Sequence, residues 1–273
     1  MARLFHIPYR FYGKLKEIDI VAGPGAYDES GLEGLATNTW TQLIIECKKS
    51  EEKPWVFFSV PEGSGRSDAS VRTFTKYTSD LDSYFKTEGA RFERGRSPLL
   101  ARIAPLCRQN HYADASIPRC VAYVEAFKNP DKPSEIYAAL DSVLSFIHYS
   151  RGKRDRGIPR RKRKPSKRRE DEILISTQFM YPVIVLDGQM LHATTSGDEL
   201  AMELSNHVQL RTFWNFPESD YELFLVDVVR KEHFKDFVDM VEKDHAEFLK
   251  CIKEVLSKVD LVRLLGYKQH GGL

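Results

Sequence analysis

Two strand-like runs near the N-terminus constrain the fold most strongly. They are KEIDIVA at 16–22 and TQLIIECKK at 41–49. Because residues 43–45 are apolar on both faces of a strand, the second run predicts a central strand that is covered on both sides. That strand runs directly into Glu46. A carboxylate at the end of a buried strand is costly unless it is paired or coordinated, so this end of the strand is a candidate site.

Asp19, Glu46 and Lys48 form the candidate site. Side chains at positions i and i+2 of a strand share a face and lie about 6.6 Å apart, so Glu46 and Lys48 project together while Cys47 points away. We expect a neighbouring strand to bring Asp19 alongside. Two close carboxylates repel each other unless a cation lies between them, and divalent cations such as Mg²⁺ prefer oxygen ligands. A purely structural arrangement of Glu46 and Lys48 is the alternative.

The pattern of an Asp on one strand and a Glu-x-Lys on the next resembles the PD-(D/E)XK nuclease superfamily, which has the restriction-endonuclease-like fold. The resemblance covers residues 1–60 well and the remainder in outline. It implies that Asp19, Glu46 and the main-chain carbonyl of Cys47 bind Mg²⁺ or Mn²⁺. It also implies that Lys48 orients or activates the attacking water. The predicted catalytic residues are therefore Asp19, Glu46 and Lys48.

The chain departs from the superfamily pattern in two places. Ile18 precedes Asp19 where many members have a proline. Many members also carry an acidic residue on a helix before the first strand, whereas residues 1–15 contain no Asp or Glu. Either this branch works without that residue, or the start of the ancestral domain is missing.

Composition places further limits on function. The 273 residues can bury one sizeable core or two small ones. No apolar stretch reaches the length of a membrane span, so we expect no membrane partner and a cytoplasmic location. The four cysteines form no CxxC pair and the eight histidines form no HExxH motif, so the sequence indicates neither a zinc ribbon nor a zinc protease site.

A basic segment at 151–170 is the strongest charge feature. It holds twelve Lys or Arg against two acidic residues, which leaves the rest of the chain with a net charge of −8. We expect this segment to be a disordered linker that docks on the backbone of a nucleic acid without reading bases. An import signal or a solubilising linker is the alternative. The predicted nucleic-acid-binding residues are Arg160, Arg161, Lys162, Arg163, Lys164, Lys167, Arg168 and Arg169.

The order of elements predicts an α/β fold. We expect a glycine-rich loop at 23–39 and a third strand at 54–60, in a hairpin with the strand at 41–49. Helices are predicted at 68–87, 98–109, 118–128 and 133–150. The last of these helices is expected to be capped by Asp131. Strands are predicted at 173–179, 181–187, 189–195, 208–216 and 221–230, with an Asp187-Gly188 hairpin turn, followed by amphipathic helices from 231 to about 265.

The predicted fold class is a mixed central sheet flanked by helices, with a restriction-endonuclease-like core, a C-terminal β-hairpin and a helical extension. Residues 1–150 would form the nuclease-like core with a helical middle, 151–170 the basic linker, and 171–273 the strands and helices that complete the same domain.

Three functions are compatible with the sequence. The first is a metal-dependent nuclease that hydrolyses phosphodiester bonds, with DNA as the expected substrate. The second is a nuclease-like nucleic-acid-binding subunit without cleavage activity, and the third is a protein-interaction module. Metal binding separates the first from the third, and cleavage separates the first from the second. Cutting both strands of DNA often takes two sites, so a homodimer is also compatible with the sequence.

Replacing residues 151–170 with a neutral linker should weaken DNA binding and flatten its dependence on salt. If about six of the charges contact phosphates, the logarithm of affinity should fall with the logarithm of salt at a slope near −5, and most of this slope should be lost in the variant. A salt titration of DNA binding measures it, with circular dichroism as the folding control. Equal slopes in the two forms would contradict the assignment.

Overall fold

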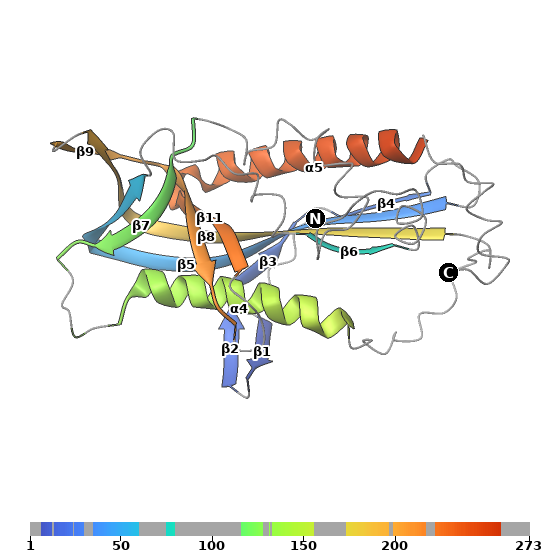
Figure 1. Ribbon diagram of the computed structural model, residues 1–273, viewed down its shortest axis with the longest axis horizontal. Helices are drawn as coiled ribbons and strands as arrows, with labels where there is room; N and C mark the ends of the chain where they lie inside the picture. The colour runs from blue at the N-terminus through green and yellow to red at the C-terminus, as the bar shows by residue number, and fades with distance from the viewer. Residues whose placement is uncertain are drawn as a thin grey trace.

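The fold is built on two long parallel strands in a computed structural model. The structure describes residues 7–12, 14–23, 25–29, 35–59, 75–79, 116–127, 131, 133–155, 173–196, 199–216 and 222–257. Strand β5 (Leu35–Ser59) pairs with β8 (Ile173–Ser196) from Leu35 to Ser50 and again from Trp55 to Phe58. These two strands run through the whole length of the sheet (Figure 1).

This pair belongs to a mixed sheet of nine strands. Its path is β3-β5-β7-β10-β11-β8-β6, with β4 added to β5 and β9 added to β8. The remaining strands are β3 (Ile20–Ala22), β4 (Gly25–Glu29), β6 (Thr75–Ser79), β7 (Arg119–Glu125), β9 (Glu199–Leu204), β10 (His207–Trp214) and β11 (Glu222–Arg230). Strands from both sides of the basic segment therefore join one sheet. Because β8 pairs with β5 as well as with β11, the path from β5 through β7, β10 and β11 closes on itself.

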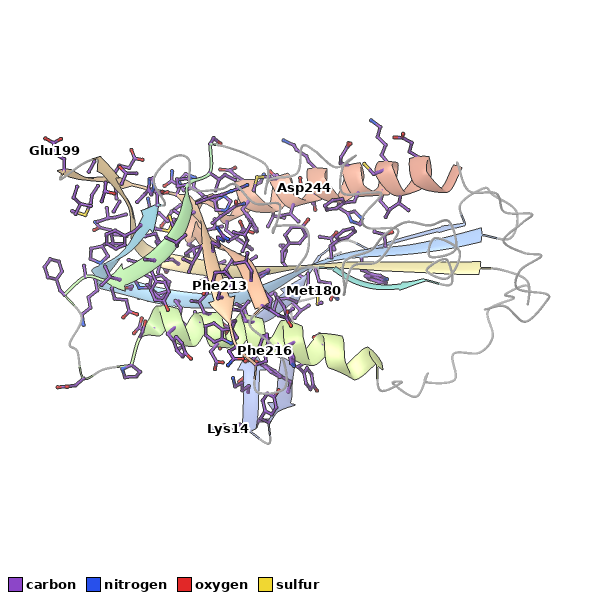
Figure 2. All side chains as sticks on the ribbon, in the orientation of Figure 1. Lys14, Met180, Glu199, Phe213, Phe216 and Asp244 are labelled. Carbon is purple, nitrogen blue, oxygen red and sulfur yellow. The ribbon has the colours of Figure 1, made fainter. Side chains whose placement is uncertain are left out.

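Helices cover both faces of the sheet, which confirms the mixed α/β architecture. Helix α4 (Glu135–Asp155) and helix α5 (Phe234–Ser257) lie on opposite faces of β5 and β8 (Figure 1). On the α5 side Phe179 stacks on Phe248 with ring centroids 4.2 Å apart. On the α4 side Phe216, labelled in Figure 2, stacks on His148 at 4.1 Å. The apolar stripe predicted on α4 is fully buried: Ile136, Leu140, Val143, Leu144 and Ile147.

A separate two-stranded hairpin packs beside α4. Strands β1 (Ile7–Phe11) and β2 (Lys14–Ile18) pair antiparallel, and Lys14 lies at the end of the hairpin that projects past α4 (Figure 2). Tyr9 anchors the hairpin, because it is buried and donates a hydrogen bond to the carbonyl of Ser142 on α4 at 3.1 Å.

Both predicted hairpin turns in the long strands are wrong. The run at 41–49 and residues 54–59 of the next run belong to one strand, β5, whose register against β8 shifts between Ser50 and Trp55. Likewise, β8 continues through Asp187-Gly188, and its antiparallel return is β9, beginning with the pair Ser196↔Glu199. The local turn signals did not produce turns, because each strand pairs with a partner on both sides of the expected turn. Strand β5 accommodates its extra residues in a bulge.

Three further predictions are corrected. The segment predicted as a helix at 118–128 is strand β7, where Val and Tyr residues favour the extended backbone and β5 and β10 supply partners on both sides. Strand β6 lies inside the helix predicted at 68–87, and β4 lies inside the loop predicted at 23–39. The helix predicted at 98–109 lies outside the described residues.

The C-terminal half agrees better with the sequence. Strands β10 and β11 and helix α5 are confirmed, with Phe237, Val241, Phe248 and Ile252 buried as predicted. Helix α4 is also confirmed, but its N-cap is Ser134 and not Asp131. The Ser134 hydroxyl accepts a hydrogen bond from the amide N–H of Tyr137 at 3.1 Å. The helix extends to Asp155, so residues 151–155 are helical and not part of a disordered linker. Residues 156–170 lie outside the described part.

Membrane crossing finds no support in the two α-helices that the structure describes. Neither combines the length with the apolar character that a bilayer-spanning helix requires.

Gly188→Ala should destabilise the protein by about 1–3 kcal/mol, the usual cost of overpacking. A Cβ at Gly188 would lie 2.3 Å from the carbonyl oxygen of Ser50, so the backbone of β5 would have to move. Urea unfolding measures the loss. The same exchange at Gly152 in helix α4 is the control, since alanine favours a helix. An unchanged unfolding midpoint for Gly188→Ala would show that the two strands can separate at no cost.

Candidate functional site

Asp19 lies at a break between two strands. The predicted strand at 16–22 is interrupted there by a bend, which separates β2 from β3. Strand β3 pairs antiparallel with β5 in the register Ile20↔Ile45, so the next positions in that register are Asp19 and Glu46. The Asp19 Oδ2 atom accepts a hydrogen bond from the amide N–H of Cys47 at 2.7 Å. The structure thus brings Asp19 to the Glu-x-Lys segment.

Glu46 and Lys48 share one face of β5. Thr41 bonds His245 of helix α5 at 2.8 Å, so odd-numbered side chains in this part of the strand face α5 and even-numbered ones face α4. The Lys48 Nζ donates to Glu46 Oε1 at 2.7 Å. Only 7% of Glu46 is exposed, whereas Cys47 on the opposite face is exposed. The carboxylate is therefore buried with one lysine as its direct partner among the bonds described.

The local field opposes the charge of Glu46. Burial raises the pKa of this carboxyl group above its ordinary value, the Lys48 hydrogen bond works against that rise, and repulsion from Asp19 and Glu17 adds to it. Although Cys47 as a residue is exposed, partial burial of its thiol raises the thiol pKa, and repulsion from Asp19 and Glu46 adds to the rise. Negative charge therefore accumulates where β3 meets β5, and a cation placed there would relieve it.

A polar group on the hairpin and on α4 adjoins the site. The Lys16 Nζ donates to Asp141 Oδ2 at 2.7 Å and to the hydroxyl of Ser145 at 3.0 Å. Burial raises the pKa of Tyr9 above its ordinary value, and the negative charges of Asp141 and Glu46 add to the rise. Sequence reasoning missed Tyr9, Lys16 and Asp141. Lys16 is visible as a neighbour of Asp19 in KEIDIVA, whereas Asp141 reaches the region only through the packing of α4.

The donor atoms at this place suit a hard cation. Mg²⁺ is commonly held by one or two carboxylates, with waters and substrate phosphates filling its other positions. Asp19 and Glu46 supply two carboxylates. Because the N–H and C=O of a strand residue point to the same neighbour, we expect the Cys47 carbonyl to face the Asp19 side, as its amide does. Among the described residues no group of three or more His, Cys, Asp or Glu side chains is arranged to hold a metal.

The predicted nucleic-acid-binding residues of the basic segment are not placed. Residues 160–169 lie outside the part of the chain that the structure describes.

Comparison with known proteins gives no family for this chain. No family model, no curated protein and no solved structure matches it.

Glu46→Gln should change the free energy of unfolding more favourably at neutral pH than at acidic pH, when the variant is compared with the wild type at each pH. Because the folded state raises the pKa of Glu46, the stability that its protonated form contributes is present below the ordinary carboxyl pKa of 4.5 and is lost as pH rises through the raised value. The neutral amide avoids that loss. Urea unfolding of both proteins from acidic to neutral pH measures the difference.

The control for this titration is Asp239→Asn. Asp239 accepts a hydrogen bond from Lys235 at 2.7 Å in an exposed pair on α5. An equal pH dependence in the two variants would show that burial of Glu46 is not the cause.

Proposed function

We propose that the protein is a Mg²⁺-dependent nuclease that hydrolyses phosphodiester bonds, with DNA as its substrate. The observation that carries the proposal is the meeting of Asp19 and the Glu46-x-Lys48 segment, joined by the 2.7 Å bond from the Cys47 amide to Asp19. Glu46 lies in the middle of β5 and not at the strand end that the sequence predicted, because β5 continues to Ser59. Two carboxylates and one lysine at this buried part of the strand still make a combination that phosphodiester hydrolysis can use.

Each residue has a separate role in this proposal. Asp19, Glu46 and the Cys47 carbonyl would hold Mg²⁺ or Mn²⁺. A bound divalent ion would supply Lewis acidity and a water of lowered pKa. The Cys47 amide fixes the Asp19 carboxylate, and Lys48 keeps a positive charge next to Glu46, where it would offset charge developing on a phosphate.

The arrangement of elements supports a restriction-endonuclease-like core. Strand β3 pairs antiparallel with β5, and β5 pairs parallel with the later strand β8. Parallel strands need a crossover connection, and helix α4 precedes β8 and packs on this sheet. We assign β3, β5, α4 and β8 to that core.

Affinity for the substrate would come from the basic segment, including Arg160, Arg161 and Lys162. Its excess of ten positive charges suits the phosphate backbone of DNA. We place this activity in the cytoplasm, and a homodimer would supply the two sites for a double-strand cut.

A nucleic-acid-binding subunit without cleavage activity is the second candidate. The observation in its favour is the 2.7 Å ion pair of Lys48 with Glu46, which balances the charge of the carboxylate without a metal ion. In that case the site would be structural, and DNA binding would persist without metal.

Asp19→Asn and Glu46→Gln should each lower Mg²⁺-dependent cleavage of DNA by about 100-fold or more, since each removes a carboxylate ligand. Lys48→Met should lower cleavage by a similar factor while metal binding is retained. A plasmid-cleavage assay and calorimetric titration with Mg²⁺ measure the two effects.

The matched control is Lys235→Met, which removes a lysine from an exposed pair with Asp239 on helix α5. It should cut at the wild-type rate. DNA binding without any cleavage by the wild-type protein would favour the second candidate, and cleavage by Glu46→Gln at the wild-type rate would place the active site elsewhere.

A further inference from the structure

Four polar side chains form a row across one face of the sheet, away from Glu46. They belong to four neighbouring strands: Cys120 of β7, Ser59 of β5, His192 of β8 and Glu203 of β9. The registers Ser59↔Cys120, Phe57↔His192 and His192↔Glu203 put all four on the same face. Ser59 follows Glu46 by roughly 40 Å of extended chain, so the row is separate from the candidate metal site.

His192 makes hydrogen bonds to two other members of the row. The His192 Nε2 bonds the Ser59 hydroxyl at short range, and its Nδ1 bonds Glu203 Oε1 at 3.2 Å. A carboxylate can only accept, so Nδ1 carries the proton toward Glu203 and Nε2 is left to accept the proton of Ser59. This is the order of contacts by which a histidine acts as the base for a serine nucleophile and a carboxylate orients the histidine.

Burial distinguishes Ser59 from its neighbour Cys120. Cys120 is fully buried, and burial raises the pKa of its thiol to about 12, although its hydrogen bond with Ser59 works against the rise. It therefore stays a thiol and does not compete as a nucleophile. Ser59 is half-buried, and only 7% of His192 is exposed. Ser59 is thus the member of this pair that both contacts a base and reaches solvent.

The strand next to Ser59 is irregular. Phe58 pairs with Ala122 whereas Ser59 pairs with Cys120, which leaves Val121 as an extra residue of β7. A bulge of this kind interrupts the ladder of backbone hydrogen bonds, and such bulges are common beside active sites. Val121 is also exposed, so the bulge itself reaches solvent.

We propose that Ser59, His192 and Glu203 form a second site, in which Ser59 is a nucleophile for acyl transfer from small activated esters. His192 is its base and Glu203 is a positioning residue.

The reaction is balanced without any further reagent. The Ser59 Oγ forms a bond to the carbonyl carbon of the ester while His192 Nε2 takes the hydroxyl proton. The bond from that carbon to the leaving oxygen then breaks, and the leaving alkoxide or phenolate takes the proton from His192. An acyl-serine remains. Water, deprotonated by the same nitrogen, attacks the acyl carbon, and the carboxylic acid leaves as Ser59 recovers its proton.

The test is covalent labelling of the full-length protein with a fluorophosphonate probe and acylation by p-nitrophenyl acetate, with the modified residue located by mass spectrometry. The wild type should be modified at Ser59. Ser59→Ala should lose this modification, and His192→Asn should slow it by about 100-fold, a usual contribution of a general base. Thermal unfolding of each variant checks that it folds.

Ser50 is the matched internal control. It is also half-buried on β5, but its hydroxyl donates to the Lys53 carbonyl at 2.7 Å and not to a histidine. Labelling of Ser59 no faster than of Ser50, or an unchanged rate in a folded His192→Asn or His192→Gln variant, would overturn the proposal and leave the row as a structural network. DNA cleavage should be unchanged in Ser59→Ala.

Glu203 is tested by two variants. Glu203→Gln should slow labelling of Ser59, and Glu203→Asp, which keeps the carboxylate, should recover most of the rate. If both variants label like the wild type, Glu203 has no positioning role and the proposed triad is contradicted.

Discussion

The parallel pairing of β5 with β8 is the interaction on which the rest of the structure depends. Parallel neighbours cannot be joined by a tight turn, so the intervening chain must cross over a face of the sheet. Helix α4 covers one face and α5 the other, so the middle of each long strand is buried on both sides (Figure 1). Glu46 is buried because it lies in this middle region, and its burial is the source of its raised pKa.

The spacing of apolar residues predicted those elements whose buried face can be read from their own sequence. Helices α4 and α5 carry apolar stripes whose central residues are buried, and the apolar residues at 224–226 and 228–229 of β11 are buried too, so local pattern and tertiary environment agree there. It failed where a distant partner decided the conformation. The Asp187-Gly188 pair is a strong local turn signal, yet Gly188 serves instead to let the Ser50 carbonyl approach. No property of residues 118–128 alone reveals that β5 and β10 lie on either side of them.

The candidate site was partly accessible to the same reasoning. Two-residue spacing predicted that Glu46 and Lys48 share a face, and the register of β3 with β5 brings Asp19 to them. The bond from the Cys47 amide to Asp19 could not be predicted, because it requires a bend in place of a continuous strand. Ser59, His192 and Glu203 are far apart in sequence and share no motif. Only the pairing of β5 with β8 and of β8 with β9 makes them neighbours.

The register shift within β5 has a consequence for how this strand presents its side chains. Ser50 pairs with Gly188 and Trp55 with Met190, so β5 contains three more residues than β8 over this stretch. An odd number of extra residues reverses the alternation of faces, so Glu46 and Ser59, although thirteen positions apart, both lie on the face of the even-numbered residues of β8. Loss or gain of one residue between 51 and 54 would turn Ser59 away from His192 and leave Glu46 unaffected. The length of this short stretch thus sets the relative orientation of two otherwise independent groups of residues.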